Sequence, residues 1–218
     1  MDRILEPEIM ADAEQALAYA NADFATSNQT FVDRLLAAGA PSLGNVVDIG
    51  CGPCDVMLRL AAARPDARIV AVDGSEAMID LARKSVRAAG REAQITAMQG
   101  YIPGLALPEH SFDAVLSKDL LHHLPDPMVL WSEARRLGRS GATVHVMDLT
   151  RPATQQQARD IVEAVAPDEH PILKDDFYNS LCAAFTIEEV EAQLREAGLP
   201  LQVSRISDRH MLVAGLLP

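Results

Sequence analysis

The feature that most constrains the fold is an apolar run that ends in an acid and two glycines. Residues 46–49 (Val-Val-Asp-Ile) lead into Gly50 and Gly52, and a helical pattern starts at Asp55. Because glycine has no Cβ, a ligand can approach the backbone of such a turn closely. The helix that follows would aim free N–H groups at the same place. The stretch therefore predicts a buried strand, a ligand-binding turn and the start of a helix.

A second acid stands in a matching place. The apolar run 68–72 ends in Asp73. An acid at the end of the second strand is where a nucleotide-type ligand has its ribose hydroxyls held. Asp48 and Asp73 are therefore expected at one ligand site.

These residues resemble the signature of class I S-adenosylmethionine-dependent methyltransferases, whose first motif is an acid followed by alternating glycines. Asp48, Gly50 and Gly52 match it, Cys54 replaces the last glycine, and Asp73 stands at the ribose-binding acid. The resemblance implies an α/β fold: a doubly wound, Rossmann-like sheet of seven mostly parallel strands, with an antiparallel last strand and helices on both faces. It implies S-adenosylmethionine as cofactor, S-adenosylhomocysteine as product, and a small-molecule acceptor of the quinone-biosynthesis type.

The resemblance also assigns cofactor contacts along the chain. Tyr101 stands where relatives often have an acid that binds adenine, so that contact must be lost or moved. Met78 occupies the position of a residue that packs against adenine, although ordinary core packing explains it equally well. The predicted cofactor-binding residues are Tyr19, Asp48, Gly50, Cys51, Gly52, Asp73, Gly74, Met78, Gly100, Tyr101, Ile102 and Lys118.

Two adjacent histidines, His122 and His123, are the predicted catalytic groups. They lie in residues 121–127, which resemble the "LHHL-x-DP" run of small-molecule methyltransferases. A neutral imidazole can take a proton from an acceptor; the alternative is that the histidines shape the loop through backbone hydrogen bonds. Adjacent helical residues point about 100° apart, so at most one is expected to face the substrate. No metal site is predicted, because no third ligand lies at an obvious spacing.

The resemblance predicts a helical lid segment, 1–40, and a methyltransferase domain, 41–218. Within the domain, 152–182 is predicted to be a helical insertion that builds the substrate pocket. Phe177, Tyr178 and Asn179 are the predicted acceptor contacts, with a solvated helix start as the alternative. The alternative for 1–40 is a set of helices packed on one side of the sheet.

A competing signal overlaps the first turn. Residues 51–54 (Cys-Gly-Pro-Cys) are identical to the active-site tetrapeptide of thioredoxins, which predicts a thiol–disulfide protein. Gly50 stands where thioredoxins usually have Trp, and Asp73 would then have no role. A same-fold enzyme that methylates a macromolecule is the other alternative, and a methyltransferase with a redox-sensitive turn would combine two of these readings.

Composition bears on the partners. The 218 residues carry 19 Lys and Arg against 31 Asp and Glu, a net charge of −12, which disfavours a long contact with a nucleic-acid backbone. Three cysteines form no disulfide framework, which suits a reducing cytoplasm. No stretch approaches the roughly 20 apolar residues that a membrane helix needs. The acceptor atom and the oligomeric state are left open.

Overall fold

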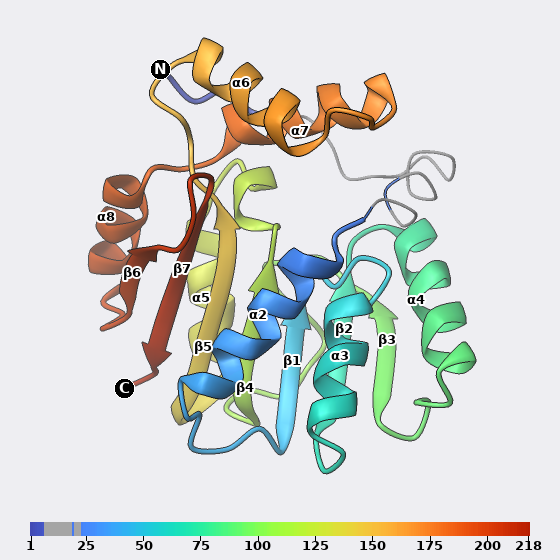
Figure 1. The fold of residues 1–218 in the computed structure, drawn as a ribbon. Helices are drawn as coiled ribbons and strands as arrows, with labels where there is room; N and C mark the ends of the chain where they lie inside the picture. Colours follow the sequence, from blue (N-terminus) through green and yellow to red (C-terminus); the bar gives the residue numbers. More distant parts are fainter. Residues whose placement is uncertain (7–18, 20–22) are drawn as a thin grey trace.

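The described chain is built on one mixed sheet. The computed structural model describes residues 1–6, 19 and 23–218. The strands are β1 (Asn45–Ile49), β2 (Arg68–Asp73), β3 (Ile95–Gln99), β4 (Phe112–Lys118), β5 (Gly138–Leu149), β6 (Gln202–Arg205) and β7 (His210–Leu216). Their order is β3-β2-β1-β4-β5-β7-β6, and β7 runs antiparallel to both of its neighbours (Figure 1). The predicted seven-stranded, mostly parallel Rossmann-like sheet is confirmed.

Helices cover both faces of the sheet. They are α2 (Ala25–Ala37), α3 (Asp55–Ala63), α4 (Glu76–Ala88), the 3₁₀ turn η1 (Leu121–His123), α5 (Met128–Leu137), α6 (Gln155–Val165), α7 (Pro171–Ala183) and α8 (Ile187–Ala197). Helices α2, α3 and α4 lie on one face, and α5 and α8 lie on the other (Figure 1). Helices α6 and α7 lie beyond the carboxyl end of β5.

Each face of the sheet has its own apolar core. Phe31, Leu60 and Ile79 belong to the cluster under α2, α3 and α4, and Trp131 and Val190 belong to the cluster under α5 and α8. Every residue of β4 is buried, because the strand is central and covered on both faces. The carboxyl ends of β1, β2 and β4 therefore open at one edge of a rigid sheet.

The N-terminal segment has two distinct parts. Helix α2 belongs to the core, since Phe31 and Leu35 are completely buried. Only the residues before α2 therefore remain candidates for the predicted lid. Most of them, residues 7–18 and 20–22, lie outside the described residues. Residues 1–6 run beside α7, where the Ile4 N–H donates to the Cys182 carbonyl at 3.0 Å.

The predicted insertion at 152–182 forms two helices, α6 and α7, which pack on each other. Its role as a substrate pocket stays a prediction. Among the described helices, none combines the length and the apolar character needed to cross a bilayer.

Trp131 and Gln193 tie α5 to α8 inside the second core. The indole N–H donates to Gln193 Oε1 at 2.9 Å, and both side chains are buried. We expect Gln193→Leu to lower the free energy of unfolding by about 1–3 kcal/mol, because the indole N–H loses its acceptor. Chemical denaturation measures this change. Gln202→Leu, on exposed β6, is the control and should stay within about 0.5 kcal/mol of wild type; equal effects of the two substitutions would contradict the argument.

Candidate active site

The turn after β1 is fastened to β2. The N–H groups of Gly50 and Cys51 both donate to the Val72 carbonyl, at 2.8 and 2.9 Å. Gly50 has φ +83°, and a Cβ there would lie 2.9 Å from Leu120 Cβ, so the turn requires glycine. Gly52 has φ +50° with no atom within 4 Å of the place of a Cβ. The turn therefore leaves open space beside its own backbone.

A cavity of about 410 Å³ lies over this turn. Of the predicted cofactor contacts, it is lined by Tyr19, Asp48, Gly50, Cys51, Gly52 and Lys118. Asn28, Asp55 and Asp119 also line it. The structure thus gathers half of the predicted set around one hollow at the carboxyl edge of the sheet.

Asp73 holds two backbone turns together. Its Oδ2 accepts from the Gly52 N–H and its Oδ1 accepts from the Ser75 N–H, both at 2.8 Å. The Gly74 N–H is a third backbone donor to this carboxylate, which still leaves acceptor capacity for a ligand hydroxyl. Burial raises the pKa of Asp73, and the backbone N–H donors oppose that shift. Asp73 is not among the residues that line the cavity, but it fixes the turn that does.

The remaining predicted cofactor contacts form a separate group beside Asp73. Tyr101 is 57% exposed, and its ring lies over Gly74, where a Cβ would approach a ring carbon to 3.0 Å. Met78 is buried, and its N–H donates to the Ser75 hydroxyl. The group consists of Gly74, Met78, Gly100, Tyr101 and Ile102, and none of its members lines the cavity. Their contacts with a cofactor stay predictions.

Asp48 is a buried carboxyl next to the cavity. Only 3% of it is exposed, and burial raises its pKa to about 8, with Asp73 adding to the shift and Lys118 opposing it. A cationic ligand next to Asp48 would lower this pKa, because a nearby positive charge favours the carboxylate form.

Asp119 is the strongest indication of a ligand. It follows β4 with φ +56°, a left-handed conformation that a non-glycine residue rarely adopts, and its carboxylate pairs with Lys118 Nζ. Burial raises its pKa, but Lys118, with His210 and His122, outweighs burial and leaves the pKa below its ordinary value. Its Oδ1 is buried without a hydrogen-bond partner in the described part of the chain. This unpartnered carboxylate oxygen on the cavity wall could accept a hydrogen bond from a cationic ligand.

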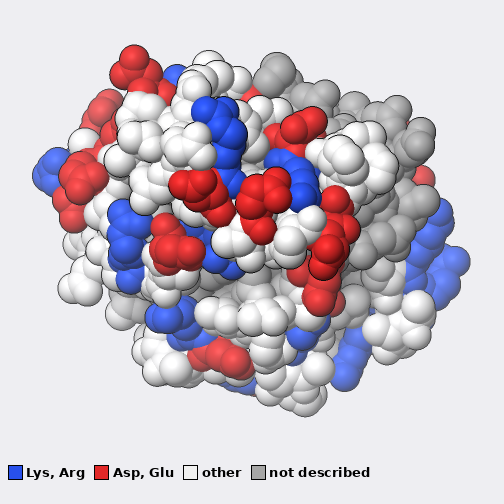
Figure 2. Space-filling view, turned by 45° about the horizontal axis from the view of Figure 1, so that its top comes forward, with Lys and Arg blue, Asp and Glu red and all other residues white. Residues whose placement is uncertain are grey.

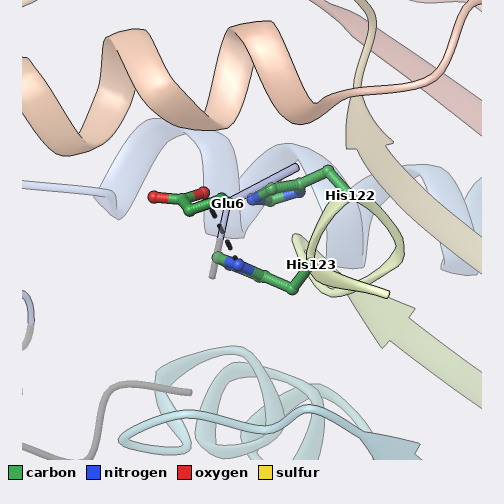
Figure 3. Close-up of side chains that lie close together, drawn as sticks. All are labelled: Glu6, His122 and His123. Atoms are coloured by element: carbon green, nitrogen blue, oxygen red, sulfur yellow. Dashed lines mark ion pairs between the residues drawn. The ribbon is translucent and has the colours of Figure 1, made fainter. Parts of the chain in front are cut away.

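The two predicted catalytic histidines lie together on η1. His122 Nδ1 lies 2.7 Å from Asp148 Oδ1, and the Leu121 N–H donates to Asp148 Oδ2 at 2.7 Å. The imidazole rings of His122 and His123 lie 4.0 Å apart, and both rings approach Glu6 (Figure 3). The rings therefore converge instead of pointing apart as α-helical spacing predicts, because the segment is a single 3₁₀ turn.

The surroundings shift the pKa values of the two imidazoles in opposite directions. Burial alone would lower the pKa of His122, but Asp148 outweighs it and the pKa lies above its ordinary value. Burial and the neighbouring His122 lower the pKa of His123 to about 3. Neither histidine lines the cavity, and their catalytic role stays a prediction.

The predicted acceptor contacts lie on α7. Phe177 and Tyr178 pack against the apolar cluster that α6 and α7 share, and Asn179 is exposed. None of the three lines the cavity, and their role stays a prediction. The next residue, Ser180, does reach the histidines' surroundings, since its hydroxyl donates to Glu6 Oε2 at 3.0 Å.

Sequence reasoning missed Asp148 and Glu6. Asp148 stands near the end of β5, and the signal that singled out Asp73, an acid where a core strand ends, could have found it. Glu6 has no such signal, because only the folded chain brings the N-terminal segment to η1.

The environment of the two thiols in the first turn disfavours redox chemistry. Cys51 is 7% exposed, Cys54 is completely buried, and both are free. A hydrogen bond to Cys54, followed by burial, raises the pKa of the Cys51 thiol well above its ordinary value. Thioredoxin-like exchange needs a thiolate that is accessible, so this environment counts against that alternative.

A comparison with protein families agrees with this geometry. Residues 46–142 match the family model described as a methyltransferase domain. Residues 46–142 are thus similar to a methyltransferase domain. The matched range contains Asp48, the turn at 50–54, Asp73 and both histidines of η1. The predicted class I methyltransferase resemblance is thereby confirmed.

Named relatives and solved structures extend the comparison. The methyltransferase domain is similar to demethylmenaquinone methyltransferase of Roseiflexus sp. (33% identity; 53% of this chain, 47% of the relative). It is also similar to ubiquinone biosynthesis O-methyltransferase of Xanthomonas campestris (30% identity; 57% and 51%). The chain spans about half the length of these curated relatives. A putative S-adenosyl-L-methionine-dependent methyltransferase from Methanococcus maripaludis shares the fold, with a TM-score of 0.74 at 18% identity over 99% of this chain and 98% of the other.

The buried Asp48 makes stability depend on pH. In the folded chain its pKa is about 8, whereas an unfolded Asp has a pKa of about 3.9. The folded state therefore keeps a proton that the unfolded state loses, and wild type loses stability as pH rises from about 4 to about 8. We expect Asp48→Asn to be more stable than wild type by more than about 1 kcal/mol near the upper end of this range, with the difference shrinking towards the lower end.

Urea unfolding at several pH values measures this difference. Asp33→Asn, an exposed acid on α2, is the matched control and should show little pH-dependent difference. A difference between Asp48→Asn and wild type that stays constant across the range would refute the assignment of a raised pKa.

Proposed function

We propose that this chain binds S-adenosylmethionine in the cavity over the first turn and transfers its methyl group to a hydroxyl of a small molecule. The observation that carries the proposal is the buried Asp119 oxygen, unpartnered within the described chain, on the wall of a cavity beside the open Gly52. A sulfonium and an ammonium group are both cationic, and Asp48 and Asp119 supply opposing charge.

The described residues fit the cofactor part by part. Asp119 and Asp48 would hold the ammonium group, and Asp73 would hold the ribose hydroxyls through its remaining lone pairs. The start of α3, next to Gly52, offers backbone N–H groups to the carboxylate. Tyr101 and Met78, on the far side of Asp73, would lie against the adenine. Each assignment is part of the proposal.

The chemistry asks little of the protein. When bound, S-adenosylmethionine supplies a methyl group on a sulfonium that is already a good leaving group, so transfer needs mainly proximity and in-line orientation. The protein must then still promote removal of the proton from the acceptor's hydroxyl. His122, oriented by Asp148, and its neighbour His123 are the groups that would promote its loss.

Three observations support a small acceptor with a hydroxyl. The names of the two curated relatives refer to demethylmenaquinone and to ubiquinone biosynthesis, and one of them is named an O-methyltransferase. A group that removes a proton is needed only where the acceptor carries one. Figure 2 shows acidic and basic side chains intermixed over the described atoms of one face, without a continuous basic patch for a nucleic acid. A reducing, cytoplasmic location is part of the proposal and accords with three free cysteines.

Asp73→Ala tests the cofactor site. The substitution removes the predicted ribose acceptor and releases the Gly52 N–H, so we expect affinity for S-adenosylhomocysteine to fall at least about tenfold, the equivalent of losing roughly 1.4 kcal/mol. Isothermal titration calorimetry measures the affinity. Asp66→Ala is the matched control, because Asp66 is an exposed acid in the turn before β2, at the opposite edge of the sheet. Wild-type affinity in Asp73→Ala would rule out this site.

His122→Ala tests the second half of the proposal. The substitution removes the imidazole behind which Asp148 lies but leaves the cavity wall intact, so affinity for S-adenosylhomocysteine should stay within about twofold of wild type. Methyl transfer should fall by about 10²-fold or more. Formation of S-adenosylhomocysteine from a panel of hydroxylated quinones and phenols measures transfer. Loss of cofactor affinity together with activity would place His122 in the cofactor site instead.

A further inference from the structure

Glu6, His122 and His123 form a cluster that the sequence does not show. One ligand atom from each lies within 4.8 Å of the other two (Figure 3). The histidines come from η1 and the carboxylate comes from the N-terminal segment. We infer that these three side chains bind one divalent transition-metal ion of the zinc type beside the acceptor's place.

His122 presents one nitrogen to such an ion. Its Nδ1 lies 2.7 Å from Asp148 Oδ1, so Nδ1 carries the hydrogen and donates it, and Nε2 keeps its lone pair. A carboxylate behind a histidine is the arrangement that fixes the tautomer and the ring orientation of metal-binding histidines. Asp148 is itself held by the Leu121 N–H at 2.7 Å. The residues that would orient His122 toward an ion are therefore in place.

His123 supplies the observation that points to a ligand. Its Nδ1 is buried and has no hydrogen-bond partner in the described part of the chain. The atom lies 3.6 Å from Glu6 Oε2, too far for a hydrogen bond. Two ligands of a tetrahedral zinc ion, each at about 2.0–2.1 Å, stand roughly 3.4 Å apart. The spacing of this pair suits a shared ion better than a direct contact.

The N-terminal segment is held in register with η1. Arg3 donates to the His122 carbonyl at 2.8 Å and to the Leu124 carbonyl at 3.0 Å, and its guanidinium lies over the Phe185 ring. Glu6 Oε2 accepts from the Ser180 hydroxyl at 3.0 Å. Three segments that are distant in sequence thus meet at one point.

The donor set decides the class of ion. Two imidazoles and one carboxylate suit zinc and similar divalent ions better than Mg²⁺ or Ca²⁺, which prefer oxygen ligands. Three protein ligands leave a coordination position open. Under the proposed function, on which this role rests, an ion here lowers the pKa of the acceptor's hydroxyl, so that its proton passes to solvent water and the remaining oxygen anion takes the methyl group. Nε2 of His122 then acts as a metal ligand, whereas in the metal-free protein the same lone pair takes the proton.

Metal titration of the chelator-treated full chain tests the site. With ZnCl₂ in calorimetry we expect one ion per chain, and with CoCl₂ a visible absorption band without a thiolate charge-transfer band, which separates this site from Cys51 and Cys54. Glu6→Gln and His123→Ala should each weaken binding by about 100-fold or more, and Asp148→Asn by about 10–100-fold. At one zinc concentration, zinc should raise the thermal midpoint of wild type by more than that of each of these variants.

The control is His110→Asn, which removes an exposed histidine outside the cluster and should bind zinc like wild type. Absence of zinc binding by wild type, equal binding by all variants, or a thiolate band would overturn the inference. Calorimetry with S-adenosylhomocysteine on the same samples separates the two proposals. Cofactor binding without zinc binding removes only the metal site, and zinc binding without cofactor binding removes only the proposed function.

Discussion

The arrangement of the site depends on one carboxylate that joins two backbone turns. Asp73 accepts from Gly52 on the first turn and from Ser75 at the start of α4. The Val72 carbonyl receives two further N–H groups of the same turn. These bonds hold the turn open against the sheet, so that the backbone beside Gly52 faces a hollow instead of closing on itself. The cavity and the start of α3 follow from that position.

The sequence predicted this half of the site because its signals are local. A strand, its terminal acid and the glycines after it lie within a few residues, and the carboxyl ends of parallel strands share one edge. The helices at 152–182 were likewise predicted from the sequence, and the family resemblance implied the antiparallel last strand, but the order of the strands in the sheet was not predicted. Only half of the predicted cofactor contacts line the cavity, because Asp73, Gly74, Met78, Gly100, Tyr101 and Ile102 do not.

The other half depends on contacts that sequence patterns do not carry. The convergence of two adjacent histidines depends on a 3₁₀ turn in place of an α-helix. Their partners come from the end of β5 and from the first residues of the chain, and no spacing rule connects Glu6 with His123. The left-handed backbone of Asp119 is also invisible in sequence, because an aspartate at the end of a strand looks ordinary until its φ is known.

The two halves of the site differ in how they are held, and this difference has a consequence for function. The half that the proposed function assigns to the cofactor is built from strand ends and backbone bonds inside the core, so its shape is fixed by the same packing that stabilises the sheet. The half that the proposed function assigns to the acceptor is assembled from η1, α7 and the N-terminal segment, joined by side-chain contacts such as Arg3 to the η1 carbonyls and Ser180 to Glu6. Local opening is easier where few buried elements must move. The η1 side of the site is therefore expected to open locally more easily than the turn at Gly50 and Gly52, whose form is fixed by the core.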